Sequence, residues 1–169
     1  GIALGGPVAL IDIEIFRKQF EVNFFGLIEV TKAYLPLLGA SKESNNQGKI
    51  INISSVSGRR SYPFIAPYTA SKFAVEAFSD SLRRELMIYG VDVILIEPGP
   101  IKTAIWNKTP DPENNEFIGS DYEPALGQFY KLFIEMGKKG LDPDIIGKRV
   151  KNILQNPRPR IRHVITPNR

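Results

Sequence analysis

The chain has 169 residues, of which 43% are hydrophobic and 24% charged, which is typical of a single globular domain. It has no cysteine, one histidine and no apolar run of the roughly 18 residues that cross a bilayer, so disulfides and cysteine-based zinc sites are excluded and we expect a cytoplasmic protein without a membrane span. Arginines near the C-terminal end supply much of the net charge of +4, and because no recognition motif accompanies them we expect no nucleic-acid partner.

The first part of the chain predicts a long helix followed by a strand. Residues 1–7 form a glycine-rich loop, and residues 11–38 follow as a helix because apolar side chains recur along one face. That face consists of Phe16, Phe20, Phe24, Leu27, Thr31 and Leu35. Phe25 and Ile28 widen it, so we expect burial on more than one side or packing on a partner. Residues 49–53 (KIINI) are typical of a buried parallel strand.

A second helix and a second strand follow a loop rich in Ser, Gly and Pro. Residues 68–89 predict the helix, and Gly90 ends it. The residues expected to face inward are Phe73, Ala74, Ala77, Phe78, Ser81, Leu82 and Leu86. Residues 91–96 (VDVILI) predict another buried strand, which the turn Pro98-Gly99-Pro100 ends.

The last third of the chain predicts two helices and a strand. Residues 107–123 are polar and turn-rich, and residues 124–136 carry the apolar stripe of a helix. Asp142 offers an N-cap and Pro143 a first turn for a helix over residues 142–156, and residues 162–166 predict a short strand. Helices that alternate with short apolar strands indicate an α/β fold with a parallel sheet.

A few polar residues lie where the apolar pattern alone does not require them. Asn23 interrupts the apolar first helix, Ser55 follows directly on the strand 49–53, and Tyr68 and Lys72 begin the second helix. In a parallel α/β sheet, ligands bind beyond the carboxyl ends of the strands. Ser55 lies at one such end, and Pro98 lies at the next.

Tyr68 and Lys72 are four residues apart, so a helix places them on one face, about 5–6 Å apart at Cβ. A tyrosine is a poor base at neutral pH because its ordinary pKa is near 10. A nearby ammonium favours the phenolate and lowers that pKa. Such a tyrosine can exchange a proton with an alcohol or a ketone while a serine hydroxyl holds the substrate oxygen, and the hydride must then come from a cofactor.

Each feature alone has an ordinary structural explanation. A Tyr and a Lys four residues apart occur by chance in many helices, and a serine after a strand is most often a turn residue. Asn23 alone fits a core amide with a hydrogen-bond partner, and Pro98-Gly99 alone fits a strand terminator. The combination is more specific than any of its parts.

Asn23, the segment NISS, the thirteen residues from Ser55 to Tyr68, the segment YTASK and the segment EPGPIKT together resemble the short-chain dehydrogenase/reductase family. Within the family, residues 71–103 most resemble the retinol and hydroxysteroid dehydrogenase branch. The resemblance implies that Tyr68 is the general acid/base and that Ser55 orients the substrate oxygen. It also implies that Lys72 lowers the pKa of Tyr68 and binds the nicotinamide ribose, and that Asn23 anchors a proton-relay water to Lys72.

The resemblance further implies an NAD or NADP cofactor, touched by Tyr68, Lys72 and the segment that follows the second strand. In that segment the matching residues are Pro98, Gly99, Ile101 and Thr103. The family's first strand and its glycine-rich turn for the pyrophosphate have no counterpart here. We therefore expect residues 1–169 to form one partial domain, the C-terminal portion of a Rossmann-like doubly wound parallel sheet with flanking helices, in which the edge of the strand 49–53 is open.

Two functions remain possible on this basis. One is an oxidoreductase that interconverts an alcohol and a ketone or aldehyde on a lipophilic small molecule, since the variable segment carries apolar side chains suited to a pocket or to ordinary core packing. These are Trp106, Phe117, Ile118, Phe129, Phe133 and Met136. The other is a non-catalytic fragment or pseudo-enzyme that has lost cofactor binding. The resemblance also implies a homodimer or homotetramer, formed through the two long helices.

Overall fold

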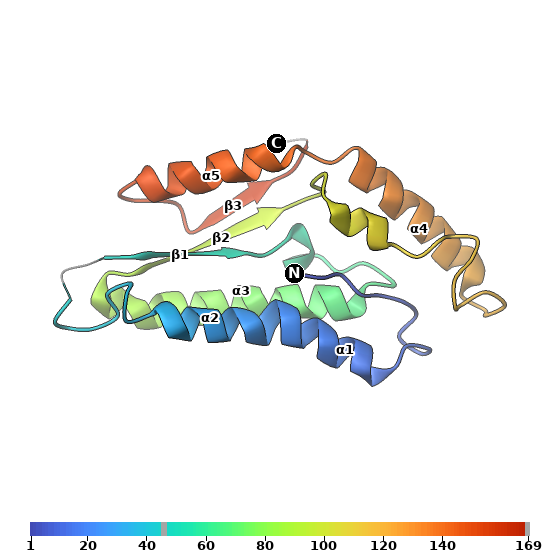
Figure 1. The fold of residues 1–169 in the computed structure, drawn as a ribbon, viewed down its shortest axis with the longest axis horizontal. Helices are drawn as coiled ribbons and strands as arrows, with labels where there is room; N and C mark the ends of the chain where they lie inside the picture. The colour runs from blue at the N-terminus through green and yellow to red at the C-terminus, as the bar shows by residue number, and fades with distance from the viewer. Residues whose placement is uncertain (45–46, 168–169) are drawn as a thin grey trace.

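The computed structural model describes residues 1–44 and 47–167, which form a parallel three-stranded sheet with helices on both faces (Figure 1). The strands, in the order in which they lie in the sheet, are β1 (Lys49–Ile53), β2 (Asp92–Pro98) and β3 (Arg162–Ile165). All strand pairs are parallel, with Ile53 beside Ile96 and Pro98 beside Ile165. The predicted α/β fold is confirmed, and each predicted strand lies within two residues of its expected position.

The helices form a layer on each side of the sheet, and helix α4 (Glu123–Lys138) extends past the end of the sheet (Figure 1). The α-helices are α1 (Ile13–Phe20), α2 (Gly26–Tyr34), α3 (Ala66–Leu86), α4 (Glu123–Lys138) and α5 (Pro143–Gln155). The short helical turns are the π-helical η1 (Glu21–Phe25) and the 3-10 turns η2 (Val56–Gly58), η3 (Met87–Tyr89) and η4 (Ala104–Lys108). Gly90 ends the segment after α3 in the left-handed conformation, with φ 70°, as the sequence predicts.

Strand β2 lies at the centre of the sheet because it is apolar on both faces. Val93 packs with Leu82 and Leu86 of α3, whereas Ile94 and Ile96 pack on the other side in a core that includes α5. These alternating directions follow from the period of two along a strand. The central strand therefore joins two separate apolar layers, and its carboxyl end is fixed from both sides.

Both ends of α5 are capped by side chains. The Asp142 carboxylate accepts a hydrogen bond from the backbone N–H of Asp144 at 2.9 Å, as its predicted N-cap role requires. At the other end, the ammonium of Lys49 donates to the carbonyl oxygens of Ile153 and Leu154, each at 3.1 Å, and to that of Asn156. A cation at this position satisfies carbonyls that lack a partner within the helix and complements the negative end of its dipole.

The predicted continuous helix over residues 11–38 is wrong in two respects. A π-helical turn, η1, separates α1 from α2, and α2 ends at Tyr34. The extra residue of a π turn rotates the following helix relative to the preceding one. Phe25 consequently leaves 48% of its surface exposed instead of widening the buried face.

The predicted inward face of α3 is also wrong in part. Phe73 is 44% exposed, and Ala77 and Ser81 face solvent, whereas Ser71 and Ser79 are fully buried. Helix α3 lies between the sheet and the α1–α2 layer, so small polar side chains are needed where the backbones approach closely. Both of these serine hydroxyls have a partner: the Asn52 amide donates to Ser79 at 2.8 Å, and Ser71 donates to the carbonyl of Tyr68 at 2.7 Å.

The outer edge of β1 is open in the part of the chain that the structure describes, where β1 pairs with β2 alone. A groove of about 430 Å³ runs beside it, between β1 and α2. Apolar side chains such as Leu27, Val30 and Ile51 line this groove. The arrangement matches the open edge expected from the sequence, and an unpaired strand edge of this kind is a template for further strand pairing.

We predict that Ile96→Ala lowers the free energy of unfolding by about 2–5 kcal/mol. Ile96 of β2 is fully buried in the core that includes α5, so removing its side chain leaves a cavity. Leu154→Ala on the exposed side of α5 is the matched control, with an expected change within about 0.5 kcal/mol. Urea unfolding followed by circular dichroism measures both. Equal effects in the two variants would contradict this packing.

Candidate functional site

The carboxyl ends of β1 and β2 place Ser55 beside the turn at Pro98. The backbone N–H of Ser54 donates to the carbonyl of Ile96 at 2.8 Å, which continues the strand ladder by one residue. Ser55 then leaves the sheet in an extended conformation, and its buried hydroxyl accepts a hydrogen bond from the backbone N–H of Ser57 at 3.1 Å. The same oxygen lies 3.4 Å from the carbonyl of Pro98. The serine is therefore fixed by backbone contacts on both of its sides.

Tyr68 and Lys72 lie in the first two turns of α3, which begins at Ala66 with Pro67 in its first turn. Proline suits this position because its fixed φ is helical and its missing N–H would have no partner there. The ammonium of Lys72 lies 5.9 Å from the ring centre of Tyr68 and donates to the carbonyl of Ile53 at 3.0 Å. Helix α3 thus brings both side chains to the carboxyl end of β1, where Ser55 follows.

Burial dominates the electrostatics of this group. Burial raises the pKa of Tyr68, and a hydrogen bond with Ser55 opposes that rise. Burial lowers the pKa of Lys72 to about 8, while the carboxylate of Glu76 acts in the opposite direction. Tyr68 is therefore a protonated phenol at neutral pH. Lys72, in contrast, has a pKa only slightly above neutral pH. The expected effect of Lys72 on the pKa of Tyr68 stays a prediction.

Asn23 has hydrogen-bond partners that differ from those expected of a relay residue. Its side-chain oxygen accepts from the backbone N–H of Ile2 at 2.9 Å, and its side-chain nitrogen donates to the carbonyl of Ile2 at 2.9 Å and to Ser71 at 3.3 Å. Asn23 therefore ties the opening segment of the chain to α3. It also lines the same cavity as Lys72, and its predicted link to Lys72 through a water stays a prediction.

Gln19 is a second buried amide that holds the same opening segment as Asn23, and the sequence analysis missed it. It is fully buried, accepts from the backbone N–H of Leu4 at 2.7 Å and donates to the carbonyl of Ile2 at 2.9 Å. Gln19 and Asn23 are four residues apart, and together they pair with residues 2–4 much as a neighbouring strand would. The available signal was the repetition of an amide at helical spacing in an apolar segment.

The loop after β2 is fixed to β3 and to the start of α5. The N–H of Gly99 donates to the carbonyl of Ile165 at 2.8 Å, and Pro100 and Lys102 exchange backbone hydrogen bonds with Leu141 at 2.9 Å each. The residues predicted to contact the cofactor therefore occupy a restrained loop. Every predicted site residue lines one cavity: Asn23, Ser55, Tyr68, Lys72, Pro98, Gly99, Ile101 and Thr103.

This cavity has a volume of about 600 Å³, and its outer part is apolar. Four of the expected apolar residues line it, namely Trp106, Phe129, Phe133 and Met136. Phe133 lies 5.3 Å from Phe129 and 4.9 Å from Trp106 between ring centres, so the same side chains pack together and form the cavity wall. Phe117 and Ile118 do not line it: Phe117 is buried against Leu126, and Ile118 is half exposed.

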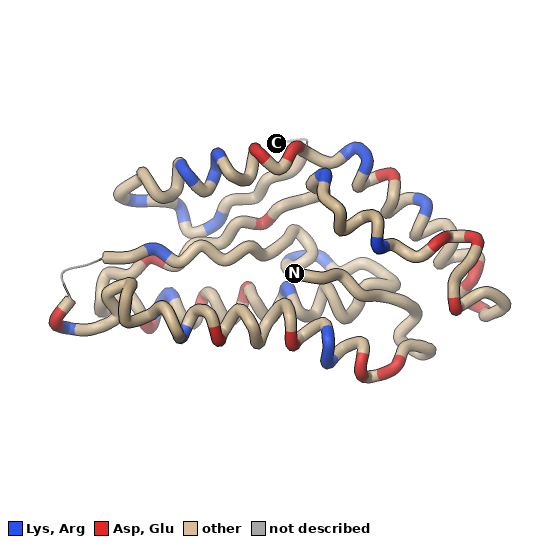
Figure 2. Tube along the Cα trace, viewed as in Figure 1, with Lys and Arg blue, Asp and Glu red and all other residues tan. Residues whose placement is uncertain are grey.

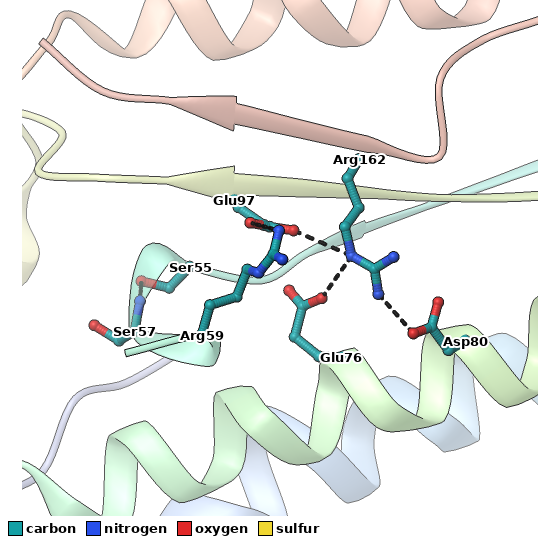
Figure 3. Close-up of polar contacts among 7 residues, drawn as sticks. All are labelled: Ser55, Ser57, Arg59, Glu76, Asp80, Glu97 and Arg162. Carbon is teal, nitrogen blue, oxygen red and sulfur yellow. Dashed lines mark hydrogen bonds and ion pairs between the residues drawn. The ribbon is translucent and has the colours of Figure 1, made fainter. Parts of the chain in front are cut away.

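An ionic cluster, also missed by the sequence analysis, lies behind the site (Figure 3). Glu97 is fully buried one residue before Pro98, with Arg59 and Arg162 within 3.5 and 3.3 Å. Burial raises the pKa of Glu97, Glu76 raises it further, and the two arginines act against this rise. The signal in the sequence was an acidic residue in an apolar strand (VILIEPG). A buried carboxylate requires a cation, but nothing local identifies which one.

Within residues 1–44 and 47–167, no helix is both long and apolar enough to cross a membrane. The same residues contain no group of three His, Cys, Asp or Glu side chains arranged to hold a metal ion.

We predict that Lys72→Met raises the free energy of unfolding by about 1–3 kcal/mol below pH 8. The folded chain holds the Lys72 ammonium less readily than the unfolded chain, since its pKa falls from 10.5 to about 8. The cost of burying the charge is therefore complete below pH 8 and disappears as the pH rises from 8 to 10.5. Lys151→Met on the exposed side of α5 is the control. A destabilised Lys72→Met variant at pH 7 would contradict the prediction.

Comparison with known proteins agrees with this geometry. The profile of the family described as short chain dehydrogenase matches residues 1–114. The chain is 44% identical, over all 169 residues, to the NADPH-dependent 3-dehydrocapnine reductase of Ornithobacterium rhinotracheale, and covers 59% of that protein. It is 31% identical to the 3-ketodihydrosphingosine reductase of Bacteroides thetaiotaomicron, with 99% of this chain and 60% of that protein covered. Human retinol dehydrogenase 8 is 33% identical, with 96% and 52% covered.

Solved structures share the fold. A short-chain dehydrogenase from Streptomyces avermitilis superposes with a TM-score of 0.77 at 24% identity, covering 99% of this chain and 58% of that one. The closed form of serine dehydrogenase in complex with NADP+ gives a TM-score of 0.76 at 28% identity, covering 99% and 62%. The chain thus spans somewhat more than half the length of the proteins that it matches. On the family match and these relatives, the chain belongs to the short-chain dehydrogenase family.

Proposed function

We propose that this chain carries the catalytic residues of an NAD(P)-dependent oxidoreductase that interconverts a ketone and an alcohol, with Tyr68 as the general acid/base. The observation that carries the proposal is the meeting of Ser55, Tyr68 and Lys72 in one largely apolar cavity. Polar groups that converge in a cavity of this kind are the usual form of an active site. The cavity also reaches the restrained loop that begins at Pro98.

The described residues fit the nicotinamide half of a dinucleotide. Lys72 offers an ammonium for the ribose hydroxyls, and the loop over Pro98, Gly99, Ile101 and Thr103 offers backbone groups and a flat apolar wall. Thr103 stands at the N-terminus of η4 without using its side chain as a cap, so its hydroxyl is available to a ligand. The bound dinucleotide would supply the hydride that a ketone carbon needs. The relative named as NADPH-dependent makes NADPH the first cofactor to test.

The chemistry of this chain's own residues favours ketone reduction. With the ketone oxygen between the two hydroxyls, Ser55 donates a hydrogen bond and Tyr68 transfers its proton to the oxygen as the carbonyl carbon accepts the hydride. The products are an alcohol and a Tyr68 phenolate, which the ammonium of Lys72 stabilises until the phenol is protonated again from solvent. Burial raises the pKa of Tyr68, so the phenol is in the protonated form that a proton donor requires at neutral pH. Two relatives named as reductases support the same direction.

The apolar end of the cavity supports a lipophilic substrate. Its wall is formed by Trp106 of η4 and by Phe129, Phe133 and Met136 of α4. Such a wall binds hydrocarbon by burying apolar surface, at about 25 cal/mol for each Å² removed from water. The reactive carbonyl would lie at the polar end, beside Tyr68, and the apolar remainder of the molecule would extend along α4.

We infer that the protein assembles as a homodimer or homotetramer through its long helices. Phe25 of η1, Val30 and Tyr34 of α2, and Phe73 of α3 leave 44–60% of their surfaces exposed. An interface formed through these helices would remove such side chains from water. A cytoplasmic location remains a prediction from the cysteine-free composition.

We predict that Tyr68→Phe lowers kcat by about 10²–10⁴-fold, because the phenol supplies the proton, and leaves the Kd for NADPH unchanged. Turnover is followed by NADPH absorbance, and binding by the fluorescence of Trp106, which is the single tryptophan and lines the cavity. Tyr62→Phe, at another tyrosine of the cavity wall, is the control. An active Tyr68→Phe variant would show that another group moves the proton. A parent chain that neither binds NADPH nor turns over would favour the non-catalytic alternative.

We predict that Phe133→Ala lowers kcat/KM for a long-chain ketone by about tenfold but has little effect on a short ketone such as butanone. The substitution removes apolar contact from the outer part of the cavity, which only the longer molecule reaches. Gln128→Ala, on the exposed side of α4, is the control. Equal losses for both ketones would show that Phe133 supports α4 rather than the substrate.

A further inference from the structure

A shared arginine connects the sheet to the catalytic helix. Arg162 of β3 extends over the face of the sheet that α3 covers and contacts carboxylates from two elements (Figure 3). Its Nε lies 3.2 Å from Glu76 and 3.3 Å from Glu97, and its Nη2 donates to Asp80 at 2.7 Å. Figure 2 shows acidic and basic positions spread along the helices on both sides of the sheet, whereas Glu97 of β2 is fully buried. The cluster therefore lies inside the molecule, between β2, β3 and α3.

Glu76 is the member of this cluster that acts on Lys72. It follows Lys72 by four residues on α3, so the two side chains lie on one face of the helix. Its Oε2 receives the hydrogen bond from Arg162, while its Oε1 is buried and has no hydrogen-bond partner among the residues that the structure describes. Figure 3 shows the two oxygens diverging, with Oε1 on the side where Ser55 lies. A fixed negative charge thus lies one helical turn from the Lys72 ammonium.

We propose that Glu76, held in place by Arg162, is a positioning residue that keeps Lys72 in its charged form. This rests on the proposed function, in which the ammonium of Lys72 stabilises the Tyr68 phenolate. Lys72 is only 9% exposed, and within residues 1–44 and 47–167 its ammonium makes one direct hydrogen bond, to the carbonyl of Ile53. A buried ammonium with so few partners loses its proton readily unless a nearby carboxylate opposes the cost of burial. The contribution of Glu76 to the pKa of Lys72 has this sign.

Arg162 is needed because Glu76 is itself close to another carboxylate. Glu97 is fully buried, and the charge of Glu76 raises its pKa. Two carboxylates in such proximity favour protonation of one of them. Arg162 contacts both carboxylates, so its positive charge offsets the repulsion between them and holds Glu76 in place beside Lys72.

The charged and titratable groups that surround Lys72 come from several elements. Helix α3 itself contributes Tyr68 and Glu76, and η1 contributes the neutral amide of Asn23, beside which the first residue, Gly1, lies. The sheet side contributes the ionic cluster. Its members there are Arg59 after β1, Glu97 of β2 and Arg162 of β3. Among these, Glu76 is the carboxylate on the same helical face as Lys72.

The test compares Glu76→Gln with Asp80→Asn in the 169-residue chain. Both substitutions remove one carboxylate from Arg162, but Asp80 lies one turn further from Lys72. The chain is labelled with ¹³C-lysine, and the Lys72 Cε signal, assigned through its loss in Lys72→Met, is followed from pH 6 to 11. We expect the titration midpoint of Lys72 to fall by about one pH unit in Glu76→Gln and to stay at the parent value in Asp80→Asn.

The measurement does not require turnover, so it separates this inference from the proposed function. An unchanged midpoint in Glu76→Gln, or an equal shift in both variants, overturns the positioning role and leaves a structural one. A lowered midpoint in a chain without activity supports the inference and counts against the proposed function. Glu76→Met serves as a second neutral variant if the amide variant does not fold. In an active chain, kcat for Glu76→Gln would match the parent near pH 6 and decline at a lower pH than the parent does.

Discussion

The register between β1 and β2 is the constraint on which the site depends. Ile53 lies beside Ile96, and the hydrogen bond from Ser54 to the carbonyl of Ile96 extends the pairing to the end of β1. The side-chain period of a strand is two, so a slip by one residue would turn every side chain to the opposite face. Asn52 would then lose Ser79, and the carbonyl of Ile53 would no longer meet the ammonium of Lys72.

Much of the architecture could be predicted because it follows from local patterns. Short β-branched runs, a proline in a first helical turn and a glycine after a helix each act within a few residues, and the strands and helix ends lie close to their expected positions. The faces of the helices were harder. Helix α3 is covered on two sides, so its buried residues include Ser71 and Ser79, which a search for apolar stripes passes over. The π turn at η1 rotates α2, which no apolar count reveals.

The residues of the site also fall into those that the sequence could identify and those that only the tertiary structure reveals. The motif residues could be named from the sequence because chain order and spacing carry the resemblance, and the structure brings Ser55, Tyr68 and Lys72 to one cavity. The partners of Asn23 and Glu97 could not be named. Asn23 meets Ile2, which is 21 residues away, and Glu97 meets Arg162, whose place beside β2 is set by the pairing with β3. Both contacts depend on tertiary placement, for which the sequence offers only an unpaired polar residue as a signal.

The ionic cluster contains more carboxylates than arginines, which limits the substitutions that its positions can accept. One guanidinium, that of Arg162, contacts Glu76, Asp80 and Glu97. Glu97 also contacts Arg59, and Glu76 lies one helical turn from Lys72. Replacing an acidic member leaves the arginine with other partners. Replacing the arginine leaves three carboxylates facing one another across the interior, which is costly when the charges are buried. A substitution at Asp80 or Glu97 can therefore occur alone, whereas a substitution at position 162 requires compensation elsewhere in the cluster.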